Sequence, residues 1–126
     1  MTPPLQAKEL FQSISDLDLV FNGPLAPLTT LRIGGPADTL ATPHTLTAHL
    51  VTIKTAHNLK LPWMILRAGS NILFADSGYR GVVISTRELK KCSLERDVLT
   101  AECGAYLSQL INEMKKKNLG GFEFTT

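Results

Sequence analysis

At 126 residues, the chain is long enough for one small domain with a hydrophobic core and too short for two comfortable domains. Its formal net charge of +2 is nearly balanced, and its charges are interspersed except at residues 115–117, which excludes an extended nucleic-acid-binding face. No apolar stretch approaches the ~20 residues that span a bilayer, and residues 1–4 lack the features of a signal peptide. We therefore expect a soluble, cytoplasmic protein.

The first predicted element is a short amphipathic helix, because its apolar residues recur at helical spacing. These residues are Ala7, Leu10, Phe11 and Ile14. A connector with proline and glycine follows at residues 22–27, and a strand is predicted at residues 37–42. Pro43 introduces a second helix, which Asn58 and Pro62 end. The predicted apolar face of this helix consists of Leu46, Leu50 and Ile53.

In the second half of the chain, the sequence predicts strands at residues 63–67, at 82–85 and near 98–103. Its last helix has apolar residues on one stripe, and Gly120 and Gly121 close it. These apolar residues are Leu107, Leu110, Ile111 and Met114. The lysine triplet lies in the last turn of that helix, where positive charge complements the helix dipole.

The order of strand, helix and strand over residues 37–67 favours a parallel pair of strands joined by a right-handed crossover. The predicted fold class is therefore α/β or α+β. We expect Trp63 to lie in the core of this fold.

An abrupt polar turn interrupts the apolar run that begins at Ile65. The turn is Ala68-Gly69-Ser70-Asn71, and apolar residues resume at Ile72. Its backbone amides, hydroxyl and side-chain amide can approach anionic oxygens, which is the chemistry that a diphosphate requires. The alternative is a surface loop that binds nothing.

Two further segments contain glycine turns. In the first, Thr29 and Thr30 can hydrogen-bond through their hydroxyls, and Gly34 and Gly35 permit a positive φ or the close approach of another group. The alternative for this segment is an ordinary loop that leads into the next strand. In the second segment, a Gly-Tyr-Arg-Gly turn precedes the 82–85 strand. Its Arg80 could meet a phosphate, but a solvated arginine is favoured.

Together, the segments at residues 25–38, 65–74 and 76–84 resemble the amino-terminal part of the UDP-N-acetylenolpyruvoylglucosamine reductase family. These flavoenzymes complete UDP-N-acetylmuramate synthesis for bacterial peptidoglycan. The resemblance implies an FAD-binding fold of the vanillyl-alcohol-oxidase/PCMH type, with its first subdomain and the start of the second. It implies an amino-terminal helix and lead-in at residues 1–21, followed by an incomplete FAD-binding domain at residues 22–126 without a substrate domain.

The resemblance also implies FAD as the cofactor, with NADPH as reductant and a UDP-sugar as substrate in the full-length family. The implied contacts to the FAD diphosphate and adjoining atoms are Ala68, Gly69, Ser70, Asn71 and Ile72. A second implied group of contacts is Thr30, Ile33, Gly34 and Gly35. Arg67 stands where the family commonly has glycine, and it could pair with a phosphate or point to water.

No residue of the chain matches a catalytic residue of the family, so residues 1–126 are expected to be inactive alone. Three interpretations remain: the FAD-binding end of a peptidoglycan-synthesis reductase, a free-standing FAD- or nucleotide-binding module, or a non-functional truncated remnant. The oligomeric state stays open.

No metal site is predicted. Cys92 and Cys103 lie eleven positions apart, which suits reduced structural thiols rather than zinc ligands or a redox dithiol. His44, His49 and His57 lack the spacing of a helical metal site, so we expect surface or partly packed histidines.

Overall fold

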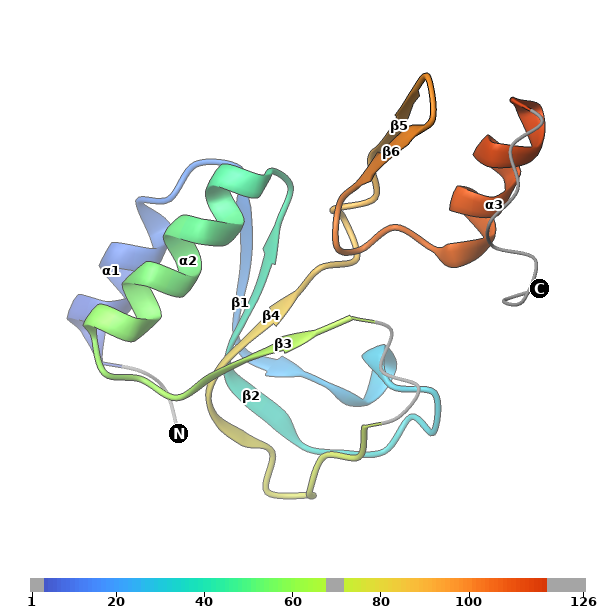
Figure 1. The fold of residues 1–126 in the computed structure, drawn as a ribbon. Helices are drawn as coiled ribbons and strands as arrows, with labels where there is room; N and C mark the ends of the chain where they lie inside the picture. Colours follow the sequence, from blue (N-terminus) through green and yellow to red (C-terminus); the bar gives the residue numbers. More distant parts are fainter. Residues whose placement is uncertain (1–3, 68–71, 118–126) are drawn as a thin grey trace.

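The computed structural model describes residues 4–67 and 72–117. Its helices are α1 (Leu5–Gln12), α2 (Leu46–Asn58) and α3 (Leu107–Lys116), with a short 3-10 turn at Ala26–Leu28. Its strands are β1 (Leu17–Pro24), β2 (Pro36–Pro43), β3 (Trp63–Leu66), β4 (Tyr79–Ser85), β5 (Cys92–Glu95) and β6 (Val98–Ala101). In Figure 1, α1 and α2 lie on one side of a sheet, and the β5–β6 hairpin and α3 extend from its other end.

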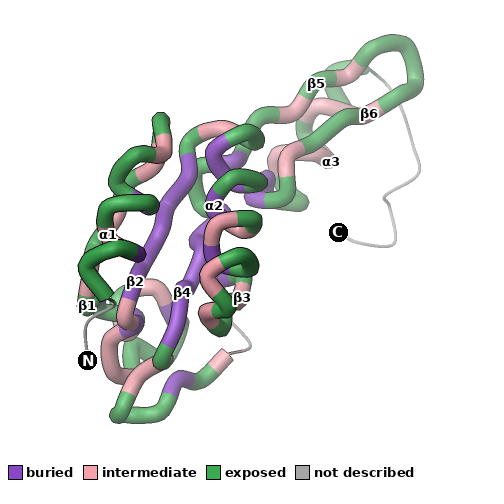
Figure 2. Tube along the Cα trace, turned by 90° about the vertical axis from the view of Figure 1, so that its left-hand side faces the viewer, coloured by how far each residue is buried: buried purple, intermediate pink, exposed green. Residues whose placement is uncertain are grey.

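The larger sheet has the strand order β1-β2-β4-β3. β1 runs antiparallel to β2, whereas β2 and β3 both run parallel to β4. The predicted strand, helix and strand over residues 37–67 are confirmed as β2, α2 and β3. The two strands are nevertheless not neighbours, because β4 enters the sheet between them and pairs with both. Figure 2 shows β2 and β4 as the buried centre of the sheet.

β1 corrects the prediction of a connector at residues 22–27, because the strand continues to Pro24. Its burial alternates weakly, as expected for an edge strand with one face on the core, and such a strand gives little hydrophobic signal. At Gly23 an added Cβ would lie 2.7 Å from the Cβ of Leu40, so glycine permits this pairing. β1 also spans residue 21, the predicted boundary between the amino-terminal lead-in and the FAD-binding domain. Residues on both sides of that boundary therefore belong to one strand.

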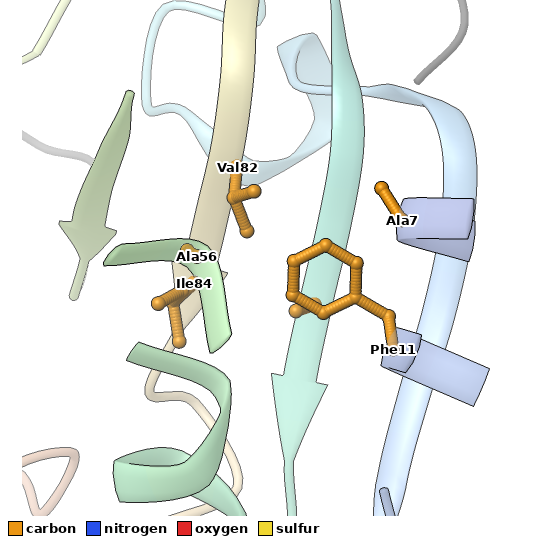
Figure 3. Packing of buried hydrophobic residues seen from close by; sticks show 6 residues of the cluster. Ala7, Phe11, Ala56, Val82 and Ile84 are labelled. Carbon is orange, nitrogen blue, oxygen red and sulfur yellow. The ribbon is translucent and has the colours of Figure 1, made fainter. Parts of the chain in front are cut away.

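The helical face of the sheet is closed by α1 and α2. Phe11 and Ala7 of α1 pack with Ala56 of α2 and with Val82 and Ile84 of β4, and Figure 3 shows the Phe11 ring at the centre of this cluster. The predicted first helix is therefore confirmed, although it ends before Ile14.

The predicted apolar face of α2 is correct for Ile53, which is half-buried against the core cluster, but wrong for Leu46 and Leu50, which are 56% and 55% exposed. The buried residues of α2 instead include Ala48, Thr52 and Ala56, whose small side chains at intervals of four residues let the helix approach its neighbours closely. The prediction assumed that the most hydrophobic residues of α2 are buried. The close packing of the helix instead buries its small residues.

Two expectations about single side chains were also wrong. Trp63 was expected in the core but is 37% exposed, because β3 is an edge strand of the sheet. His49 was expected at the surface or partly packed but is only 6% exposed on the inner side of α2. His44 and His57 are exposed as expected.

The last part of the described chain consists of the β5–β6 hairpin and α3. The predicted strand near 98–103 is confirmed as β6, whereas its short polar partner β5 was missed. α3 is confirmed and has Lys115 and Lys116 in its last turn. The predicted closing glycines lie outside the described residues.

Replacing Phe11 by alanine should lower the free energy of unfolding by about 3–5 kcal/mol, because the ring is fully buried and its loss leaves a cavity. Urea denaturation would measure this. Leu5→Ala, in the same helix but 73% exposed, is the matched control and should change stability by less than about 0.5 kcal/mol. Equal losses in both variants would contradict the placement of α1.

A second stability prediction concerns the exposed pair His44 and Asp18, whose Nε2 and Oδ2 atoms lie 2.7 Å apart. The hydrogen bond to Asp18 raises the pKa of His44 above its ordinary value near 6.5. The raised value means that this contribution to stability is complete below about pH 6.5 and is lost as the pH rises through the folded-state pKa.

Urea denaturation across pH 5.5–8.5, chosen to span about one unit below and two above that value, should show wild type more stable than His44→Gln at the acidic end. The difference should shrink toward the basic end. His57→Gln removes an exposed histidine outside this pair and serves as the control. A stability difference between wild type and His44→Gln that grows with pH would contradict the raised pKa of His44.

Candidate functional site

The two groups of predicted cofactor residues come from segments that the fold brings into contact. The N–H of Gly35 donates to the carbonyl of Ala75 over 2.8 Å. At Gly34, an added Cβ would lie 2.7 Å from the Cβ of Phe74. The loop before β2 therefore lies directly against the segment that leads into β4. Residues 68–71 lie outside the described residues, between the end of β3 and Ile72.

The glycine prediction is confirmed in its backbone conformation. Gly34 has φ +133°, and an added Cβ at Gly35 would lie 2.1 Å from the carbonyl oxygen of Asp76. Gly78, in the facing turn, has φ +82° and leaves no room for a Cβ beside the carbonyl of Pro36. The group that approaches these glycines is the backbone of the facing segment of this same chain.

The other predicted residues differ in how far they are free to contact a ligand. Thr30 is exposed and Ile33 is 50% exposed, so both side chains are accessible. Thr29 is buried and donates its hydroxyl to the carbonyl of Ala26 over 3.0 Å. The half-buried side chain of Ile72 packs on the cluster that contains Phe74.

The two arginines of the region have unexpected partners. Arg80 is exposed, as expected for a solvated arginine, and its guanidinium also donates to the carbonyl of Pro36 over 2.9 Å and lies 3.1 Å from Asp38 Oδ1. Arg67 Nη2 donates to the carbonyl of Ala105 over 2.9 Å. Neither contact had a sequence signal, because each acceptor lies about forty positions away along the chain.

A separate hollow of about 930 Å³ lies between the start of α2 and the β5–β6 hairpin. Leu46, Leu50 and both cysteines contribute to its lining, and none of the predicted cofactor residues that the structure describes does. His49 also faces it, and burial lowers the pKa of this histidine. The hollow is therefore distinct from the contact between the two glycine segments, which are the loop with Gly34 and Gly35 and the segment from Phe74 to Gly78.

Within residues 4–67 and 72–117, histidine, cysteine, aspartate and glutamate form no group of three suited to a metal ion. Cys92 and Cys103 are both free thiols. In the same part of the chain, no helix has the length and apolar character needed to cross a bilayer.

Comparison with known proteins identifies the family and the fold of this chain. The family model described as the FAD binding domain matches residues 37–126. The chain belongs to the FAD-binding domain family. Two solved structures share its fold: p-cresol methylhydroxylase with substrate bound, and CrmK, a flavoenzyme involved in shunt product recycling in caerulomycin biosynthesis.

The match to p-cresol methylhydroxylase has a TM-score of 0.64 at 16% identity and covers 90% of this chain and 25% of that one. The match to CrmK has a TM-score of 0.65 at 15% identity and covers 80% of this chain and 22% of that one. The predicted FAD-binding fold of the vanillyl-alcohol-oxidase/PCMH type is thereby confirmed.

Among curated relatives of this FAD-binding domain are UDP-N-acetylenolpyruvoylglucosamine reductases. The one from Clostridium botulinum strain Hall is 37% identical over 123 residues, which cover 94% of this chain and 40% of the relative. The one from Clostridium perfringens strain SM101 is 37% identical over 117 residues, which cover 93% and 38%. The chain thus spans about 40% of the length of the curated relatives it matches.

Replacing Gly35 by alanine should push the FAD-binding domain's two glycine segments apart, because the new Cβ meets the carbonyl of Asp76. We expect a loss of about 1–3 kcal/mol in unfolding free energy, measured by urea denaturation. Ile33→Ala, two residues away and half-exposed, is the control and should cost about 0.5 kcal/mol or less. An unchanged stability of Gly35→Ala would contradict the close approach.

Proposed function

We propose that this chain is the FAD-binding part of an NADPH-dependent UDP-N-acetylenolpyruvoylglucosamine reductase, acting in the cytoplasm in peptidoglycan precursor synthesis. The observation that carries the proposal is that the loop with Gly34 and Gly35, one of the two implied groups of cofactor contacts, packs directly against Phe74 and Ala75, which follow the other group at residues 68–72. The match of the FAD-binding family and the 37% identity to these reductases support it. When bound, FAD would supply hydride transfer from NADPH to the enolpyruvyl double bond.

The accessible groups of this region suit an anionic dinucleotide. Thr30 offers an exposed hydroxyl, and Arg67 is an exposed cation at the carboxyl end of β3. Ligands of open sheets with parallel strands bind outside the carboxyl ends of those strands, where β3 leads into residues 68–71. The donors available here are therefore of the kind that diphosphate oxygens accept.

Each group of residues has a proposed role. The diphosphate and adjoining atoms would be held by Ala68, Gly69, Ser70, Asn71 and Ile72. The loop before β2 would contact the cofactor through Thr30, Ile33, Gly34 and Gly35. Residues 22–126 would carry the cofactor-binding part, with α1 and the first half of β1 supporting its sheet.

We assign no catalytic role to residues of this chain. Ser85 is buried in β4, and Ser77 lies in the exposed turn before Gly78. A proton donor must reach the carbon that it serves, and neither serine matches the proton donor of the family. The proposed contribution of these residues is to bind and orient the cofactor.

The test uses the protein expressed from its complete reading frame. A bound flavin spectrum together with NADPH oxidation that requires UDP-N-acetylenolpyruvoylglucosamine would support the reductase. Flavin binding without that oxidation would support a binding module instead. A folded protein that binds no flavin would refute the proposal.

Gly69→Val should weaken FAD binding by at least about tenfold, which corresponds to about 1.4 kcal/mol, because the side chain blocks close backbone approach to the diphosphate. FAD titration followed by flavin fluorescence would measure the affinity. Ser15→Val adds bulk to an exposed turn between α1 and β1, which belongs to neither group of proposed contacts, and should leave the affinity unchanged. Equal affinity in wild type and Gly69→Val would remove the diphosphate assignment.

A further inference from the structure

We propose that Arg67 is an additional anion-binding residue, which holds the cofactor diphosphate at the carboxyl end of β3. This inference rests on the FAD binding proposed above. It names a cofactor-binding residue in addition to the two groups proposed there, at residues 68–72 and 30–35. Its support is the position of the guanidinium, the kind of partner that holds it, and the charge that remains free.

The guanidinium is anchored to a rigid point of the fold. Arg67 Nη2 donates to the carbonyl of Ala105, which is almost fully buried. The preceding Gly104 fits so closely against Thr86 that an added Cβ would overlap its carbonyl oxygen, and the Gly104 N–H donates to Leu89 over 2.8 Å. The acceptor is therefore fixed before any ligand arrives, and so is the arginine head.

The anchor leaves the charge of Arg67 available. A carbonyl is neutral and takes one of the five N–H donors of a guanidinium. Among the described residues, no carboxylate lies within 4 Å of Arg67, whereas Arg80 is paired with Asp38 at 3.1 Å. An exposed guanidinium with unused donors suits the paired oxygens of a phosphate, which it binds in a forked geometry.

Arg67 lies between the four-stranded sheet and the segment that leads into α3, which is a suitable location for a ligand held between them. In the described part, Arg67 makes the side-chain hydrogen bond that joins the four-stranded sheet to the segment before α3. In Figure 1, β3 points toward the side on which α3 begins. The guanidinium therefore stands at the end of a parallel strand, where ligands of such sheets bind.

The experiment compares Arg67→Gln, Arg67→Lys and Lys54→Gln with wild type in the protein expressed from its complete reading frame and stripped of flavin. Fluorescence titrations give the dissociation constants of FAD and of riboflavin, which lacks the diphosphate. Lys54 is exposed on α2, so its variant removes the same charge far from β3.

We expect Arg67→Gln to weaken FAD binding by about tenfold or more, since hydrogen bonds to charged groups are the strong ones. Arg67→Lys should recover part of that loss, and the difference from wild type should shrink in high salt. Riboflavin affinity should change in none of the variants, and FAD affinity should be unchanged in Lys54→Gln.

Unchanged FAD affinity in Arg67→Gln would overturn the inference while leaving the proposed function intact. An equal loss for FAD and riboflavin would also overturn it, because it would indicate a structural role of the Ala105 contact. A wild-type protein that binds neither flavin would overturn the inference together with the proposed function. If Arg67→Gln does not fold, Arg67→Lys decides by the same comparison.

Discussion

The contact between Gly34-Gly35 and the segment that ends at Gly78 is the constraint on which the rest of this fold depends. It sets the beginning of β2 beside the beginning of β4, where Ala37 pairs with Tyr79. The register then shifts by one residue, and parallel pairing continues from Thr39–Val82 to Ala41–Ile84. Any side chain at these glycines would separate the two central strands of the sheet. The same contact holds the loop with Gly34 and Gly35, one of the two segments proposed to bind FAD, so a change at these glycines would alter both the stability of the sheet and the site.

Local patterns predicted the long elements of this fold, because their apolar residues repeat at the period of the element itself. They failed where a partner distant in the chain decides the outcome. β1 is a strand because β2 lies beside it, and its own residues, with Gly23 and Pro24 at one end, read as a connector. The inner face of α2 is set by the closeness of the sheet, which selects Ala48 and Ala56 over larger leucines.

In the candidate site, the special conformation of the glycines was predictable from the sequence, whereas their contacts were not. Paired glycines require an unusual φ or a close neighbour, and Gly34 has both. The identity of that neighbour, Phe74, follows from the order of strands in the sheet, which no spacing in the sequence encodes. Arg67 and Arg80 show the same limit, since arginine has five donors and the sequence does not say which distant carbonyl or carboxylate will meet them.

The proposed contacts lie toward opposite ends of the parallel strands, and this separation bears on the size of the ligand. Gly35 precedes the start of β2, whereas Arg67 follows the end of β3, which is level with the end of β4 at Ser85. β4 has seven residues, so at about 3.3 Å from each residue to the next its ends lie roughly 20 Å apart. A lone phosphate could contact only one of these ends. An elongated ligand with a central diphosphate could contact both, which is why the arrangement favours a dinucleotide such as FAD over a smaller anion.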